Sequence, residues 1–355
     1  MEKNKETYNK RIEYIKQTLQ ERGIDENTQN YVIRFVQMNQ ELFGNIIDMD
    51  KLVKRLTNNM QHGISTNLEG YDTPHQIFML SLTSGAWDPY KKRIFVSPFY
   101  KIGTMISKRF ILSRDSTLFH ELDHCGTTEY IDESEQEKEE YIRNYIETNG
   151  IRSIPDKNEF RRVTNQMYEM NNGKKVISGI TGADVEDDIA LNLSQLNEGI
   201  TAYKQEMYDR YNKTKPKSQY RVQKGLAKLI ADVIGEENML KLHFDNDYNG
   251  IREMFNSKTG KDLNKIVKML NRIKATELMF AGRLGDVAFW VMLKRYMKDA
   301  NMKPDKEKRD LTIPDTKENE QIGIGLNEIN QVTLEMRKDL TQTQIQEQEQ
   351  EVETK

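Results

Sequence analysis

The sequence predicts an α+β fold that is mostly helical, with one small sheet. Apolar residues recur at helical spacing over residues 1–62 and again through the C-terminal half to about residue 302. Between these regions, residues 77–97 are rich in β-branched and aromatic residues, which favour strands. A segment with helix-capping residues follows, and its apolar residues lie on both sides of two histidines. We therefore expect a helix that packs beside the sheet.

The elements of the first half follow from local patterns. The run YVIRFVQMNQELFGNII has helical periodicity and predicts helices over residues 1–62. Residues 77–87 and 93–97 flank the turn sequence DPYKK and predict a β-hairpin, with Gly85 inside its first strand. Ser113–Ser116 offers several N-cap candidates for the helix that carries the histidines.

The second half is predicted to be mainly helical. Residues 132–147 are highly charged and predict a solvated helix. Residues 148–184 predict loop and short helix, because they contain the turn sequences NNGKK and SGITG. A long helix is expected over residues 185–212. Further amphipathic helices are predicted over Tyr220–Ile234, Asn238–Phe244, Leu263–Leu270 and 276–297.

Composition excludes several classes of protein. The chain has 355 residues and a net charge of −3, so a nucleic-acid partner is not expected. Its single cysteine excludes an internal disulfide framework. The first twenty residues lack the apolar core of a secretory signal, and no apolar run has the roughly 20 residues of a membrane span. A cytoplasmic protein is expected, with export by a signal-less route left open.

Three residues within STLFHELDHCGTTEY carry recognisable chemistry: His120, Glu121 and His124 form the pattern H-E-x-x-H. On a helix, residues four apart share one face, so both imidazoles can reach one metal ion. Glu121 lies about 100° further round the helix, where its carboxylate can reach a metal-bound water without ligating the metal. Zinc lowers the pKa of such a water toward about 7, and a carboxylate can then accept its proton.

A catalytic zinc site normally has three protein ligands, so a further ligand is needed. A third histidine six residues after the second would complete one known arrangement, but that position is Tyr130. A glutamate from a later helix is the other usual ligand. Glu198 in LNEGITAY is the candidate, because Gly199 and the preceding apolar residues predict a buried helix. The competing acidic residues are Glu186, Asp187, Asp188 and Glu206.

With HELDH on one predicted helix and LNEGITAY on a later one, residues 85–208 resemble the gluzincin group of zinc metallopeptidases. The resemblance implies a zincin-like domain that binds one zinc ion per chain. It implies that the metal ligands are His120, His124 and Glu198, that Glu121 is the general base, and that Gly199 lets the second helix approach the first.

Two residues depart from the gluzincin pattern. Thermolysin-like members carry an acidic residue at the position of Ala202, where it hydrogen-bonds the first histidine. The partner of that histidine is then expected elsewhere, from Asn197 or from a backbone carbonyl. Asp123 places a charge inside the motif, where zinc peptidases usually carry uncharged residues.

The resemblance also implies a group that stabilises the oxyanion and a strand that binds the substrate. The stabiliser is usually a Tyr or His, and the candidates are Tyr208, Tyr211, Tyr220 and His243. Zincins carry an edge strand with which the substrate pairs. Residues 84–97 match that strand region, and an ordinary hairpin is the alternative.

These observations predict a zinc metallopeptidase that hydrolyses a peptide or protein substrate. A non-catalytic zinc-binding protein that acts through partner binding is the alternative, favoured by Asp123 and Ala202. Three regions are expected: an N-terminal helical region over residues 1–70, a zincin-like catalytic domain over 71–302, and a disordered, charged and Gln-rich tail over 303–355. Substrate specificity and oligomeric state stay open.

Overall fold

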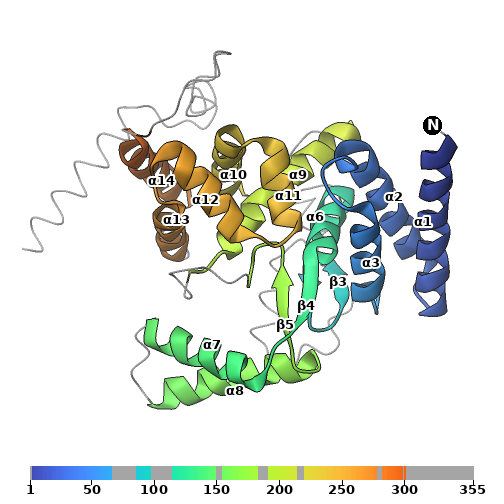
Figure 1. Ribbon diagram of the computed structural model, residues 1–355, viewed down its shortest axis with the longest axis horizontal. Coiled ribbons are helices and arrows are strands. Elements are labelled where there is room, and N and C mark those ends of the chain that lie inside the picture. Colours follow the sequence, from blue (N-terminus) through green and yellow to red (C-terminus); the bar gives the residue numbers. More distant parts are fainter. Residues whose placement is uncertain are drawn as a thin grey trace, which may run out of the picture. The chain divides into compact units, whose positions relative to one another are not determined.

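A computed structural model describes most of residues 2–300, and it is mostly helical with small sheets, as the sequence predicts (Figure 1). The described residues are 2–65, 85–96, 114–148, 154–182, 191–213, 220–277, 282–298 and 300. Their contacts group Met1–Met302 into one compact unit. The predicted disorder of residues 303–355 lies outside the described residues.

The predicted N-terminal helices are present as α1 (Glu2–Glu21), α2 (Glu26–Phe43) and α3 (Met49–Asn59). Asp25 caps α2 by accepting a hydrogen bond from the backbone N–H of Thr28 at 2.9 Å. The apolar faces of α2 and α3 pack against α6 (Arg114–Thr127). At Gly126 of α6, a Cβ would lie 2.6 Å from Leu52 Cδ1 of α3, so a larger residue would require the Leu52 side chain to shift.

A small three-stranded sheet lies beside α6. It comprises β1 (Ile64–Ser65), β2 (Gly85–Asp88) and β3 (Arg93–Val96), in the order β1-β3-β2. β1 runs parallel to β3, and β2 pairs antiparallel with β3 as the predicted hairpin. Residues 77–84, also predicted to be strand, lie outside the described residues. β2 contacts α6 directly, and a hydrogen bond from β2 holds Glu121 of α6 in place.

α6 continues without a break into β4 (Thr128–Asp132), which pairs antiparallel with β5 (Lys174–Ser178). The chain between these strands forms α7 (Glu135–Thr148), as predicted, and α8 (Ile154–Met170) (Figure 1). The prediction of loop and short helix over residues 148–184 is wrong, because α8 has 17 residues and β5 follows it. The turn chemistry lies at the positive-φ residues Asn172 and Gly173 between α8 and β5, and at Gly179 and Gly182 after β5.

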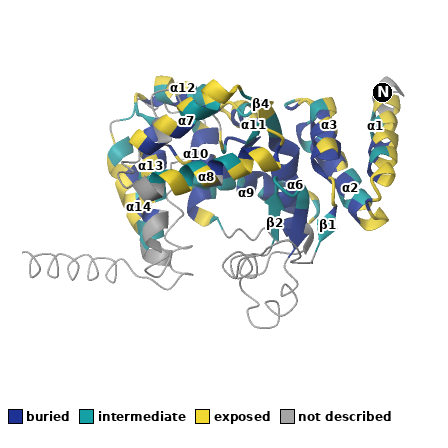
Figure 2. Ribbon diagram, turned by 90° about the horizontal axis from the view of Figure 1, so that it is seen from below, coloured by how far each residue is buried: buried dark blue, intermediate teal, exposed yellow. Residues whose placement is uncertain are grey.

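The C-terminal half is helical, and its first element is α9 (Ser194–Tyr211), which begins later than predicted. It is followed by α10 (Arg221–Ile234), α11 (Glu236–Phe244), α12 (Tyr248–Thr259), α13 (Leu263–Glu277) and α14 (Gly282–Met297). The sequence did not predict α12, whose first turn contains Gly250 and is capped by Asp247. Figure 2 shows that α6 and α9 are buried over most of their described length.

Gly199 is needed for close packing, but against a different helix from the predicted one. A Cβ at this position would collide with the backbone carbonyl of Gln223 on α10. The glycine therefore lets α10, rather than α6, approach α9.

No helix among the described residues is long and apolar enough to cross a membrane.

Candidate metal centre

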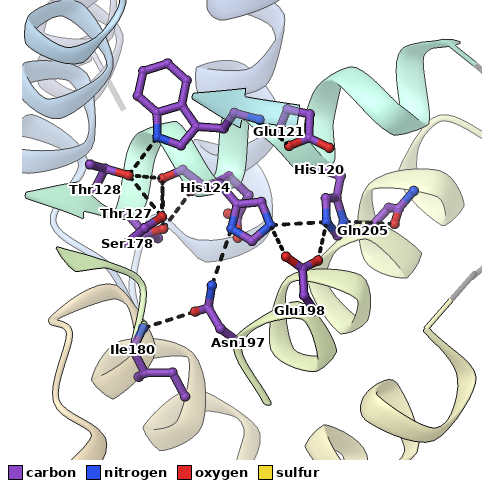
Figure 3. Close-up of polar contacts among 12 residues, drawn as sticks. His120, Glu121, His124, Thr127, Thr128, Ser178, Ile180, Asn197, Glu198 and Gln205 are labelled. Atoms are coloured by element: carbon purple, nitrogen blue, oxygen red, sulfur yellow. Dashed lines mark hydrogen bonds and ion pairs between the residues drawn. The ribbon is translucent and has the colours of Figure 1, made fainter. Parts of the chain in front are cut away.

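Helices α6 and α9 bring His120, His124 and Glu198 together (Figure 3). Nε2 of His120 lies 3.0 Å from Glu198 Oε2, and Nε2 of His124 lies 3.3 Å from Glu198 Oε1. The two Nε2 atoms are 3.2 Å apart. Both imidazoles are buried, with 5% and 7% exposure, so few water molecules compete for these atoms.

The spacing of this triad fits a metal ion. Ligands about 2.0–2.1 Å from a tetrahedral metal lie about 3.3 Å from one another, close to the three separations above. Two imidazoles and one carboxylate form a donor set that zinc accepts. The triad could therefore hold a metal ion.

Among the described residues, no other candidate for the third ligand joins His120 and His124 in place of Glu198. Glu206 pairs with Lys224 at 2.6 Å and with Arg210. The other rivals, Glu186, Asp187 and Asp188, lie outside the described residues.

Burial and neighbouring charges shift the pKa values of His124 and Glu198. Burial by itself would lower the pKa of His124, but the carboxylates of Glu198, Glu121 and Asp123 raise it to about 9. Burial would raise the pKa of Glu198, but the charges and hydrogen bonds of the two imidazoles hold it well below its usual value. A metal ion has to displace the proton that these groups share, so metal binding and proton release are coupled.

The predicted base, Glu121, is held by the sheet. The backbone N–H of Trp87 in β2 donates a hydrogen bond to Glu121 Oε2 at 2.8 Å. A Cβ at Gly85 would lie 3.3 Å from Glu121 Cγ and 2.7 Å from Thr117 Cγ2, so glycine lets β2 approach α6 here. Burial raises the pKa of Glu121, while the nearby imidazoles oppose this rise.

Each histidine of the triad contacts one side-chain amide of α9. Nδ1 of His120 lies 3.2 Å from Gln205 Oε1. Nδ1 of His124 lies 3.4 Å from Asn197 Nδ2, a long contact (Figure 3). Asn197 was one of the partners predicted for the first histidine, but it contacts the second. Gln205 was not predicted from the sequence, although it lies seven residues, or two helical turns, after Glu198 and therefore on the same face of α9.

Two hydrogen-bond donors hold the side-chain oxygen of Asn197, and one of them is His243. Its Oδ1 accepts hydrogen bonds from the backbone N–H of Ile180 and from His243 Nε2, both at 3.0 Å. His243 is fully buried, and burial lowers its pKa to about 3, so it is neutral and donates through Nε2. Gly179 is required beside this pair, because a Cβ there would collide with Asn197.

The four candidate stabilisers lie in different places. The ring of Tyr220 stacks on the ring of His120, with centroids 5.6 Å apart and an interplanar angle of 10°. Burial and the charges of Glu198 and Glu121 raise the pKa of Tyr220 well above its usual value. The remaining hydroxyls and the imidazole are engaged elsewhere: Tyr208 with Asn39 and Asp123, Tyr211 with Glu41, and His243 with Asn197.

Asp123, the charged residue inside the motif, points away from the triad into a buried ion pair. Its Oδ1 pairs with Lys204 of α9, and both side chains are nearly inaccessible, at 2% and 3% exposure. The hydroxyl of Tyr208 lies 3.2 Å from the same oxygen. Burial would raise the pKa of Asp123, but Lys204 lowers it, so the carboxyl is ionised. The ion pair therefore ties α6 to α9, while the Asp123 carboxylate also contributes to the raised pKa of His124.

Comparisons of the sequence with known protein families, with curated proteins and with solved structures find no match.

Proposed function

We propose that this chain is a zinc-dependent metallopeptidase of the gluzincin type, built on a zincin-like domain. The observation that supports the proposal is a buried carboxylate, Glu121, next to a converging group of two imidazoles and one carboxylate. A structural zinc site has no use for a base beside its ligands, whereas hydrolysis needs one.

His120, His124 and Glu198 would hold one zinc ion per chain. Catalytic zinc sites have three protein ligands and keep a fourth position open. When bound, zinc lowers the pKa of a water molecule and polarises the scissile peptide carbonyl.

Glu121 moves the proton in this proposal. Its Oε2 is held by the N–H of Trp87, so we assign proton transfer to Oε1. The carboxylate takes a proton from the attacking water and later passes it to the leaving amine. Burial raises the pKa of Glu121, which makes it a stronger base near neutral pH than an exposed glutamate.

Tyr220 is the candidate stabiliser whose ring contacts a ligand, so we assign it the oxyanion role. Its hydroxyl would donate a hydrogen bond to the negative charge that develops on the carbonyl oxygen. Its raised pKa keeps this hydroxyl protonated and able to donate.

The alternative is a zinc-binding protein without catalysis. The departure from the gluzincin pattern at Ala202 favours it, because α9 lacks the acidic residue that thermolysin-like members carry at this position. Asp123 no longer favours this alternative, because its charge is neutralised by Lys204.

Glu121→Gln separates the two functions. The substitution keeps the size and most contacts of the side chain, so zinc content should equal that of wild type. Cleavage of a peptide library should fall by about 10²–10⁴-fold, because the proton acceptor is lost. The measurement is mass-spectrometric detection of cleaved peptides, with zinc content determined on the same samples. Equal cleavage by wild type and variant would contradict the assignment, and a zinc-loaded wild type that cleaves nothing would support the alternative.

A further inference from the structure

We propose that Gln205, locked by Ser116, is the positioning residue of the first metal ligand: it fixes a proton on His120 Nδ1 and leaves Nε2 for the metal. The inference rests on the proposed metal site and not on peptide hydrolysis. Gln205 lies on the α9 face that carries Glu198 and is 3% exposed. It supplies the acceptor that Ala202, three residues earlier, does not.

Hydrogen bonds to Ser116 decide which way the amide of Gln205 faces. Its Nε2 lies 2.6 Å from Ser116 Oγ and 3.3 Å from the Ser116 carbonyl oxygen. A carbonyl oxygen can only accept, so the amide nitrogen belongs on this side and the amide oxygen on the other. Ser116 precedes His120 by one helical turn, so α6 itself supplies the group that orients the amide.

The orientation of the amide then fixes the tautomer of the ligand. Gln205 Oε1 lies 3.2 Å from His120 Nδ1, and this oxygen can only accept, so Nδ1 carries a proton. A neutral imidazole with its proton on Nδ1 has its lone pair on Nε2, the atom that faces Glu198 Oε2 at 3.0 Å. His120, Gln205 and Ser116 are exposed by 5% or less, so water does not replace the amide in this role.

Asn197 does not do the same for His124. The backbone N–H of Ile180 can only donate, and it lies 3.0 Å from Asn197 Oδ1. The amide nitrogen of Asn197 therefore faces His124. The two amides have opposite orientations toward their histidines, and of the two Gln205 presents the acceptor that a metal-bound imidazole usually has.

Zinc affinity of matched variants tests the inference. Gln205→Leu should bind zinc about 10–100-fold more weakly than wild type, the usual cost of losing such a partner. Gln205→Glu keeps an acceptor and should bind within about threefold of wild type, or more tightly, because a carboxylate raises ligand basicity. Gln223→Leu is the control: this glutamine is 5% exposed and bonds Gln195. Its affinity should stay within about threefold. Equal affinities of Gln205→Leu and wild type would overturn the inference.

The tautomer itself can be read in the wild-type protein, which covers the case in which Gln205→Leu does not fold. In zinc-loaded protein with ¹⁵N-labelled histidine, nuclear magnetic resonance should show His120 coordinated through Nε2. Its Nδ1 proton should be protected from exchange with solvent. Coordination through Nδ1, or an unprotonated Nδ1, would overturn the inference and leave the peptidase proposal standing. A wild type that binds no zinc would overturn both, whereas loss of cleavage without loss of zinc binding would affect only the peptidase proposal.

Discussion

Glu198→Ala is expected to weaken zinc binding by more than 100-fold. The substitution removes the carboxylate whose two oxygens face the two histidines at 3.0 and 3.3 Å, and it leaves two protein ligands. Loss of an outer-shell partner already costs about 10–100-fold, so loss of a ligand should cost more. The measurement is competition with a chromophoric chelator at fixed pH, with zinc content determined by mass spectrometry.

Glu206→Ala is the matched control for this prediction. Glu206 lies on the same helix and was a rival for the third ligand, but it pairs with Lys224 and Arg210. Its substitution should leave zinc affinity unchanged. If Glu198→Ala held zinc as tightly as Glu206→Ala, the third ligand would have to be another residue.

Lys204→Met is expected to destabilise the fold by about 3–5 kcal/mol. The substitution leaves Asp123 ionised and buried at 2% exposure without its cation, and an uncompensated buried charge has a cost of this order. Lys224→Met removes a partly exposed partner of Glu206 and should cost about 1 kcal/mol or less. Urea unfolding of the metal-free proteins measures both free energies.

A double variant separates the lost ion pair from the lost side chain. Asp123→Leu combined with Lys204→Met replaces both charges by apolar groups, which is often nearly neutral for a buried pair. It should recover most of the stability that Lys204→Met loses. A free energy of unfolding for Lys204→Met within about 1 kcal/mol of wild type would contradict the role assigned to this pair.

The first part of the site could be predicted because its geometry is local. His120 and His124 are one helical turn apart, so their spacing alone places both rings on one face of α6. Glu198 was predicted from a short motif, and the structure brings it beside both histidines. Its role as a ligand stays a prediction.

The partners of the histidines could not be predicted in the same way. Gln205 is oriented by Ser116, which is distant in sequence, and only its two-turn spacing from Glu198 distinguishes it from a solvated glutamine. Asp123 was interpreted as a departure from the gluzincin pattern, because its ion-pair partner, Lys204, lies on another helix and is not visible in the motif. Gly199 was correctly predicted to permit close packing, but the sequence could not show that α10 is the approaching helix.

The fold was predicted best where periodicity is strong and turn residues are few. The helices α1–α3, α7, α10 and α11 follow from apolar spacing or from charge. α8 was not predicted because turn sequences lie next to it and indicated a loop. α12 was not predicted because Gly250 lies in its first turn. The β4–β5 ribbon pairs two strands with 41 intervening residues, 133–173, and such pairing has no local signal.

X-ray absorption at the zinc edge of the purified wild-type protein tests the metal centre most directly. We expect one zinc per chain with four nitrogen or oxygen neighbours at about 2.0–2.1 Å and scattering from two imidazoles. A sulfur neighbour at about 2.3 Å would point to Cys125, which is buried on α6, and would contradict the assigned ligands. A protein without stoichiometric zinc, or zinc with fewer than two imidazoles, would contradict the account as well.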